Sequence, residues 1–499
     1  MESIRLVRYV TAAPGAILAA ALMAACGGGG SATSSPAAPT VTIALSATKS
    51  AVNSPVTLTW SSTGATSCQG ADAWSGAQAT SGNTMITPSA GGQHKYTVQC
   101  AGAGGNGSTT ATLIVPMPVL PTSYQNKNRP EISDTEMPRA DLLGIENSTS
   151  AYFHNRPYAV ADFTQEGKFS VMAFQTQFSS PAQLATGFSD TANKAYIVQR
   201  NSDGNYVDIT SRLIPNLADR QVCVTPTYAI VADFNKDNKP DVFVACTGPD
   251  YQVNGVWLDA TTEQIAFISQ PDGTYKKWKS TFKTYGHQCS AGDLNEDGNV
   301  DVVCTDAGKT PFTLLGDGRG DFTRDDTRFP DLTNKAVGAI ELVDIGSGKL
   351  DVFIGGVTQN ADPWPASQYN NVLIRNDGAG SFRSNAPIVL PTSLAPKMVA
   401  QGMNYNYSAL HDVIVNGGYA YILQYDYMYT SMIIRKVNLL NVQDQVIVFE
   451  NIGTFTGTNK VVPLIKPTFD GYIVPLMACE FTRSDARFST SACGVRVRM

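Results

Sequence analysis

The chain has 499 residues, of which only 16% are charged, and its formal net charge is −6. A chain of this length exceeds what one hydrophobic core serves, so we expect two to four domains. The negative charge, without a basic stripe interleaved with aromatic residues, argues against a nucleic-acid-binding protein. Plentiful glycine, serine, threonine and asparagine favour an all-β chain of short strands and turns over long helices.

Residues 1–25 have the pattern of an export signal. Arg5 and Arg8 precede an apolar run that ends at Met23 and is too short to span a membrane. The following Leu22-Met-Ala-Ala-Cys26 resembles a bacterial lipobox, which implies cleavage before Cys26 and lipidation of its thiol. An ordinary secretory signal with an incidental cysteine is the alternative. The interpretation as a lipobox predicts a lipid-anchored protein of the bacterial cell envelope, at the outer membrane or the cell surface.

Residues 26–40 are rich in glycine, serine and proline, and predict a flexible tether. Residues 41–116 then contain alternating strand-like stretches separated by turn residues, as in a β-sandwich. This segment resembles the immunoglobulin-like modules of bacterial surface lipoproteins, which implies a stalk. It departs from antibody domains because Trp60 precedes the first cysteine of the segment. Prolines from Pro116 onward predict a stiff linker over residues 117–130.

The cysteine count agrees with an exported protein. Of nine cysteines, eight remain once Cys26 is set aside, and an even number in an oxidising compartment predicts disulfides. The sequence does not fix their connectivity. Local pairing favours Cys68–Cys100, Cys223–Cys246, Cys289–Cys304 and Cys479–Cys493.

Two acidic loops are the most informative motifs of the chain. Residues 293–301 read Asp-Leu-Asn-Glu-Asp-Gly-Asn-Val-Asp, and residues 233–241 repeat this spacing of oxygen-bearing side chains, with Asn238 in place of Gly298. Oxygen ligands with several carboxylates suit Ca²⁺, which accepts flexible loops more readily than Mg²⁺. We therefore predict about two Ca²⁺ sites. Their ligands are the side chains of Asp233, Asn235, Asp237, Asp241, Asp293, Asn295, Asp297 and Asp301, and the backbone carbonyls of Lys239 and Asn299.

An EF-hand begins in the same way but needs a bidentate glutamate at its twelfth place. That place is occupied by Val244 in one loop and by Cys304 in the other, and neither side chain can serve. Short β-type runs follow both loops, so each loop is expected to join two strands. Solvated acidic turns without a metal remain the alternative.

From residue 131 onward the chain repeats a pattern: an apolar strand ending in aspartate, a polar loop, a second and a third strand, and a glycine turn followed by an aromatic residue. The repeats begin at Asp162, Asp233, Asp293 and Asp344, roughly 50 to 70 residues apart, a spacing typical of propeller blades. Residues 155–390 resemble the FG-GAP/VCBS repeat family, which implies an integrin-α-like β-propeller over residues 131–499, with about six or seven blades.

The resemblance places calcium in the two complete loops only. In the Asp162 loop, residues 162–170, Ser170 replaces the ninth-place carboxylate, so weak binding or none is expected. The Asp344 loop, residues 344–351, is one residue short and has lost its middle ligands, so no metal is expected there. The calcium is expected to stabilise the loops rather than to contact a ligand.

No nucleophile elbow, Walker loop or His-Glu-x-x-His motif is present, and the four histidines are too scattered for a zinc site. The leading function is recognition or adhesion, with an extracellular protein or glycan as partner. The alternative is a propeller hydrolase or lyase that acts on extracellular polysaccharide. Trp364 is a candidate for ligand stacking, as are the tyrosines between residues 405 and 429, for which buried packing between blades is the competing interpretation.

Overall fold

The computed structural model describes residues 35–117, 119, 153–177, 194–223, 226–248, 252–253, 256–257, 261–306, 309–332, 337–356, 371–390, 409–416, 418–425, 431–452, 464–467, 472–476 and 497–498. The predicted signal, the lipidated Cys26, most of the linker, Trp364 and the pair Cys479–Cys493 lie outside these residues. Among the described helices, none has the length and apolar character needed to cross a bilayer.

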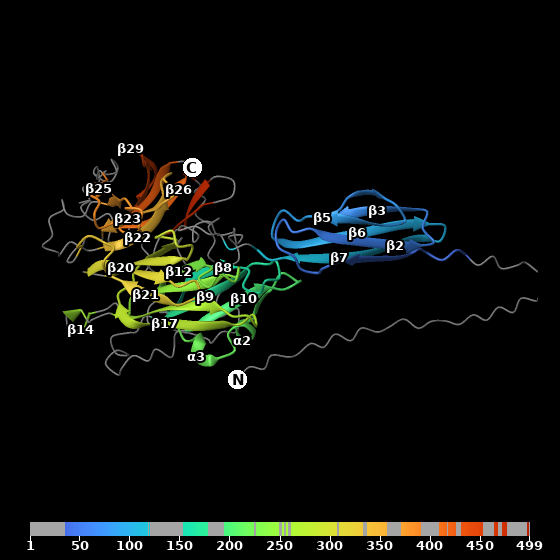
Figure 1. Ribbon diagram of the computed structural model, residues 1–499, viewed down its shortest axis with the longest axis horizontal. Coiled ribbons are helices and arrows are strands. Elements are labelled where there is room, and N and C mark those ends of the chain that lie inside the picture. The colour runs from blue at the N-terminus through green and yellow to red at the C-terminus, as the bar shows by residue number, and fades with distance from the viewer. Residues whose placement is uncertain are drawn as a thin grey trace, which may run out of the picture.

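The N-terminal unit, residues 40–115, consists of two antiparallel sheets and is called the sandwich below (Figure 1). Its strands are β1 (Thr40–Leu45), β2 (Val56–Thr63), β3 (Ser67–Asp72), β4 (Gly76–Gln78), β5 (Ser81–Ile86), β6 (Gly92–Gly102) and β7 (Gly105–Val115). The sheet orders are β1-β2-β5 and β4-β3-β6-β7. Alternate residues of β2 are buried, as expected of a strand with one face on a core.

Two tryptophans and a disulfide fill one end of the sandwich core. The ring centroids of Trp60 and Trp74 are 4.7 Å apart, and both rings pack against the disulfide Cys68–Cys100. The predicted pairing is confirmed, but its place differs from that in antibody domains. Cys68 and Cys100 are directly opposite each other on β3 and β6 of one sheet, whereas antibody domains join two sheets.

The rest of the described chain is a succession of antiparallel sheets (Figure 1). The first sheet contains β8 (Phe153–Ala161), β9 (Ser170–Gln177), β10 (Ala195–Arg200) and β11 (Tyr206–Asp208), and the second contains β12 (Pro226–Ala232), β13 (Asp241–Cys246), β16 (Thr262–Ser269) and β17 (Tyr275–Thr284). The third sheet contains β18 (Cys289–Gly292), β19 (Asp301–Asp306), β20 (Lys309–Gly316) and β21 (Phe322–Asp325). The fourth contains β22 (Val337–Asp344), β23 (Leu350–Gly356), β24 (Val372–Ile374) and β25 (Ile388–Val389).

The fifth sheet contains β26 (Ala409–Asn416), β27 (Tyr419–Tyr425), β28 (Ser431–Asn438) and β29 (Asn441–Ile452), and three further strands pair as β30 (Leu464–Pro467), β31 (Tyr472–Leu476) and β32 (Val497–Arg498). A side hairpin, β14 (Gln252–Val253) and β15 (Val256–Trp257), and two short helices, α2 (Thr210–Leu213) and α3 (Leu217–Arg220), complete the described elements.

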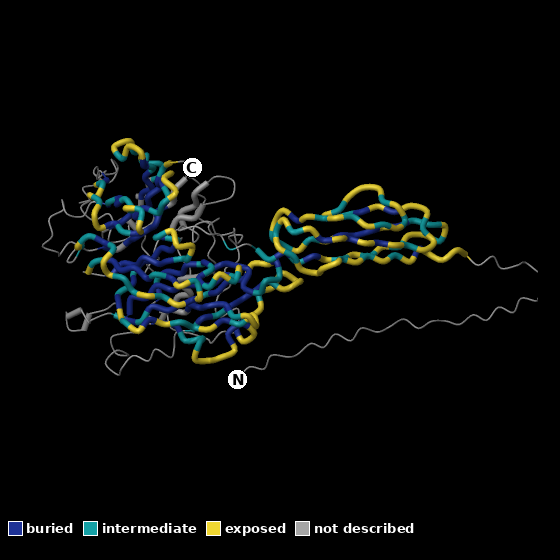
Figure 2. Tube along the Cα trace, viewed as in Figure 1, coloured by how far each residue is buried: buried dark blue, intermediate teal, exposed yellow. Residues whose placement is uncertain are grey.

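In each of these sheets consecutive strands are neighbours, and the first strands of successive sheets adjoin one another, from β8 through β12, β18, β22 and β26 to β30. Apolar clusters fill the space between neighbouring sheets. Phe174 of the first sheet and Phe267 of the second have ring centroids 5.8 Å apart, for example. Strands β13 and β19 are buried along their whole length, whereas residues 271–273, in the turn between β16 and β17, are exposed (Figure 2). The described chain is nearly all-β, and this succession is consistent with a β-propeller.

Both acidic loops join two strands, as predicted, because β13 and β19 begin at the ninth place of each loop. The predicted disulfides Cys223–Cys246 and Cys289–Cys304 are also present. Cys289 and Cys304 are directly opposite on β18 and β19, so their bond closes the hairpin that carries residues 293–301.

Replacing both Cys289 and Cys304 by alanine is expected to lower the free energy of unfolding by about 3 kcal/mol, because the open hairpin gains freedom in the unfolded chain. Urea denaturation of the variant, compared with the unmodified chain, measures the loss. The same double replacement at Cys68 and Cys100 is the control, since it should destabilise the sandwich alone. An unchanged midpoint for the unfolding of the successive sheets in the first variant would contradict the expectation.

Candidate metal centre

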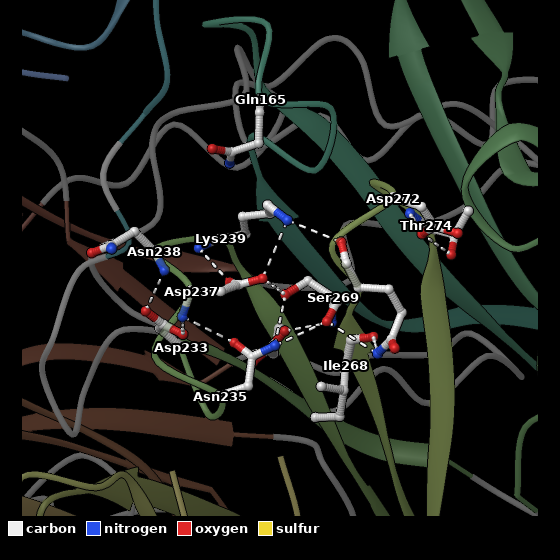
Figure 3. Close-up of polar contacts among 12 residues, drawn as sticks. Gln165, Asp233, Asn235, Asp237, Asn238, Lys239, Ile268, Ser269, Asp272 and Thr274 are labelled. Carbon is white, nitrogen blue, oxygen red and sulfur yellow. Dashed lines mark hydrogen bonds and ion pairs between the residues drawn. The ribbon is translucent and has the colours of Figure 1, made fainter. Parts of the chain in front are cut away.

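The Asp233 loop, residues 233–241, curls around the carboxylate of its first residue (Figure 3). Asp233 Oδ1 accepts the N–H of Asp237 at 3.1 Å, and Oδ2 accepts the N–H of Asn238 at 2.8 Å. Two residues of this loop adopt positive φ, Lys236 at 60° and Asn238 at 62°. The positive φ at Asn238 is the one that its place in the motif predicts.

The Asp293 loop, residues 293–301, repeats this arrangement in the third sheet. Asp293 accepts the N–H groups of Asp297 and Gly298 at 3.1 and 2.9 Å. Positive φ again occurs at the fourth and sixth places, at Glu296 (60°) and Gly298 (80°). The two loops therefore share one backbone conformation. The positive φ at the fourth place was missed in the sequence, because neither lysine nor glutamate signals it.

The third and fifth places are also matched between the loops. Asn235 Oδ1 accepts the N–H of Asp237 at 3.2 Å, and Asp237 Oδ1 accepts the N–H of Lys239 at 2.9 Å. In the Asp293 loop the equivalent bonds are 3.3 Å from the Asp297 N–H to Asn295 Oδ1, and 2.8 Å from the Asn299 N–H to Asp297 Oδ1. Each of these polar side chains thus uses one oxygen to hold the loop.

The ninth-place aspartates are fully buried and connect the loop to the third strand of their sheet. Asp241 accepts the N–H of Phe234 at 2.8 Å on one oxygen and that of Ser269 at 2.7 Å on the other. Asp301 accepts the N–H groups of Leu294 at 3.0 Å and Gly316 at 2.9 Å. We predicted these residues only as metal ligands. Their structural role was missed because Ser269 and Gly316 lie far along the chain.

Burial makes the charged form of these carboxylates costly. It raises the pKa of Asp241 to about 7, although the N–H of Ser269 favours the charged form. Burial likewise raises the pKa of Asp301 to about 6, and the charges of Asp297 and Asp293 add to that rise. The pKa of Asp233 is also raised, first by burial. A nearby cation would oppose these shifts, because an opposite charge favours the ionised carboxylate.

A lysine side chain distinguishes the two loops. Lys239 Nζ is 3.3 Å from Asp237 Oδ2 and donates to the carbonyl of Gln270 at 2.9 Å (Figure 3). Ser269 Oγ donates to the same Asp237 oxygen at 3.0 Å. The Asp293 loop has Asn299 at the place of Lys239, so it has no ammonium group there. We predicted Lys239 for its carbonyl and did not foresee its side chain.

Within the described ranges, no three acidic, histidine or cysteine side chains converge as a metal cluster. The ninth-place carboxylates accept backbone N–H groups on both oxygens. The remaining donors of each loop are two carboxylates, an asparagine amide and backbone carbonyls. This all-oxygen set fits Ca²⁺, which tolerates mixed carboxylate, amide and carbonyl ligands.

In the fourth sheet, an arginine side chain pairs with the buried aspartate. Asp351, at the start of its second strand, accepts Arg375 Nη1 at 2.8 Å and the N–H of Asn376 at 2.9 Å. Asp344 accepts the N–H groups of Gly346 and Gly348, at 2.8 and 3.2 Å. In the sheet that carries the shortened Asp344 loop, the Arg375 guanidinium group therefore already pairs with the buried carboxylate of Asp351.

The loops also touch the neighbouring sheets. Asn376 Nδ2, in the turn after β24, donates to the carbonyl of Leu294 in the Asp293 loop at 3.0 Å. Gly380 of the same turn lies against this loop, since a Cβ there would be 3.0 Å from Asn295 Cβ. The conformation of the Asp293 loop therefore affects the contact between the third and fourth sheets.

Of the candidate stacking residues, only part of the tyrosine run is described. Tyr421 is 1% exposed, and Lys436 Nζ lies 4.2 Å from the ring centroid of Tyr419 and 5.6 Å from that of Tyr421. The burial of Tyr421 favours the packing interpretation for this residue. Trp364 lies outside the described residues.

No protein-family model matches the chain, and no curated protein matches it either. Similar solved structures include a Bacteroides thetaiotaomicron protein of unknown function (10% identity, TM-score 0.31, 91% of this chain and 96% of that one). Another is Trypanosoma rangeli sialidase in complex with the inhibitor DANA, with 10% identity and a TM-score of 0.32 over 84% of this chain and 55% of that one. A third is a quinonprotein alcohol dehydrogenase-like protein from B. thetaiotaomicron, with 8% identity and a TM-score of 0.25 over 80% of this chain and 93% of that one. Likenesses at these TM-scores assign neither family nor function. The assignment of a nearly all-β chain of successive antiparallel sheets therefore depends on its own strands.

Proposed function

We propose that this protein is a calcium-stabilised β-propeller of the FG-GAP/VCBS type that serves recognition or adhesion at a bacterial surface. In this proposal a lipid at Cys26 anchors the chain, the sandwich is an immunoglobulin-like stalk, and about six or seven blades form a ring that binds an extracellular protein or glycan. One observation carries the proposal: the Asp233 and Asp293 loops share one backbone conformation and the same pattern of oxygen donors.

The physical role of the cation follows from the charges. Each loop gathers three carboxylates, one of them fully buried, and their mutual repulsion is stronger where burial excludes water. A bound Ca²⁺ would remove that repulsion and order the loop, and binding to the folded state alone would stabilise the ring by mass action. Because Asn376 contacts the Asp293 loop, ordering this loop would also support the contact between the third and fourth sheets.

Recognition can be tested with the full chain carrying Cys26→Ser, so that no lipid is attached. Arrays of glycans and extracellular-matrix proteins would be probed with millimolar calcium and again with a chelator. The proposal expects a partner that is bound in calcium and lost on chelation, because the loops order the ring. Release of sugar fragments from a polysaccharide, without stable binding, would contradict a recognition function and favour an enzyme.

The two loops should differ in affinity for calcium, because Lys239 already provides positive charge beside Asp237. Replacing Lys239 by methionine, in a chain whose Asp293 is alanine, is expected to tighten calcium binding at the Asp233 loop by roughly threefold to fivefold. Isothermal titration calorimetry measures the change. Lys276→Met, at an exposed lysine of the same sheet, is the control. Equal affinities for both variants would show that the ammonium group does not compete with the cation.

A further inference from the structure

The Asp162 loop, residues 162–170, has the positive-φ pattern of the Asp233 and Asp293 loops, but its first carboxylate has different hydrogen-bond partners. Gln165 and Gly167 have φ values of 57° and 67°, at the same fourth and sixth places as in the Asp233 and Asp293 loops. Asp162 is 1% exposed, so its carboxylate is as inaccessible as the ninth-place aspartates. The ninth place holds Ser170, whose hydroxyl donates to the carbonyl of Ala161 at 3.4 Å and provides no carboxylate.

Four donors surround the Asp162 carboxylate. One oxygen accepts the N–H of Glu166 at 3.0 Å and the hydroxyl of Thr164 at 3.3 Å. The other accepts the N–H of Gly167 at 2.8 Å and the N–H of Met117 at 3.0 Å. The first three donors belong to the loop itself, whereas Met117 follows β7 and comes from the end of the sandwich.

Two further contacts join the sandwich to this loop. Gln93 Nε2, at the start of β6, donates to the carbonyl of Glu166 at 3.0 Å. Gly167 lies directly against Gly92, because a Cβ at residue 167 would be 2.6 Å from the Gly92 carbonyl carbon and oxygen. Glycine at position 167 therefore permits a close approach of two backbones. In Figure 1 the sandwich meets the successive sheets on the side of β8 and β10.

We propose that the Asp162 loop is a docking site for the sandwich of the same chain, in which the Met117 N–H takes the place that a cation would occupy. A buried carboxylate needs positive partners, and backbone N–H groups satisfy it as a metal ion would. The loop is then no third cation site. It fixes the sandwich and the first sheet as one rigid unit, whether or not the other loops bind calcium.

Hydrogen exchange on the unmodified chain gives a direct test. The amides of Met117, Glu166 and Gly167 are expected to exchange slowly, and at similar rates, because all three donate to one buried carboxylate. Mass spectrometry with fragmentation of the peptides that cover residues 113–120 and 160–170 assigns the exchange to single amides. Exchange of the Met117 amide at the rate of a free peptide would overturn the proposal. This test needs no variant, so it does not depend on whether a variant folds.

A matched pair of variants tests the rigidity. Met117→Pro removes the donor, whereas Met117→Ala keeps it; residue 117 precedes Pro118, so its backbone already favours the extended region that proline can adopt. Small-angle X-ray scattering of the full chain with Cys26→Ser compares them. The alanine variant should match the parent chain, and the proline variant should show a larger maximum dimension and the signature of two units moving independently.

A second pair guards against a local effect of proline. Gly167→Ala would clash with Gly92, whereas Gly204→Ala introduces the same strain at positive φ (80°) where no atom lies within 4 Å. Only the first should loosen the sandwich. Scattering curves of Met117→Pro and Gly167→Ala that are identical to the parent curve would show that these contacts do not hold the units together.

Discussion

Removal of calcium is expected to lower the melting temperature of the successive sheets by on the order of 10 °C. At a free concentration one thousand times the Kd, binding to the folded state contributes about 4 kcal/mol per site. Two sites would thus supply a large part of the usual stability of a domain. The reason is the mutual repulsion of the carboxylates gathered in the Asp233 and Asp293 loops, which a bound cation would remove. Differential scanning calorimetry with calcium and with a chelator measures the shift.

The control for this prediction is a chain in which Asp233 and Asp293 are both alanine. Its melting temperature should be low and should not respond to calcium, because the first-place carboxylates that organise both loops are missing. Asp272→Ala, in the turn after β16, leaves both loops intact and should keep the full response. A parent chain that melts at the same temperature with and without millimolar calcium would exclude a stabilising cation.

Replacement of Asp241 by alanine is expected to cost about 3 to 5 kcal/mol of unfolding free energy, even in a chelator. The buried N–H groups of Phe234 and Ser269 would each lose their acceptor, and an unsatisfied buried donor costs about 1–3 kcal/mol. The small cavity left by the carboxylate adds to the loss. Urea denaturation with a chelator present measures this cost separately from any effect of calcium.

Asp241→Asn serves as the matched variant, because the amide keeps one acceptor oxygen and should lose about half as much stability. If Asp241→Ala were as stable as the parent chain in a chelator, the ninth-place aspartate would be a metal ligand only. A loss confined to calcium-loaded protein would support the same conclusion.

Much of the fold could be predicted because its signals are local. The strand, loop and turn of each repeat lie within a short segment, so the starts at Asp162, Asp233 and Asp293 indicate successive sheets. The pair Cys289–Cys304 was predictable for the same reason, since it flanks one hairpin. The pairing of Cys68 with Cys100 was also correct, but cysteine spacing does not reveal whether a bond lies within one sheet or between two.

The candidate site was predicted less completely, because several of its contacts link distant residues. Asp241 meets Ser269 of the third strand, and Asp351 meets Arg375, through pairings that exist only once the sheets have formed. Asp162 meets Met117 from another unit. None of these partners has a motif of its own. The shared oxygen pattern of the loops indicated their common shape. It did not indicate the partners that differ between them: the Lys239 ammonium, the Arg375 guanidinium and the Met117 N–H.

The Arg375–Asp351 pair has a consequence for behaviour in dilute surroundings. A guanidinium group is covalently part of the chain and keeps its charge at every physiological pH, so the fourth sheet carries its counter-charge everywhere. Among the described residues no ion pair gives the carboxylates of the Asp293 loop such a partner, although the Lys236 ammonium lies nearby, since a Cβ at Gly298 would be 3.6 Å from Lys236 Nζ. If the Asp293 loop binds Ca²⁺ as proposed, the third sheet would therefore loosen in ion-poor water before the fourth does.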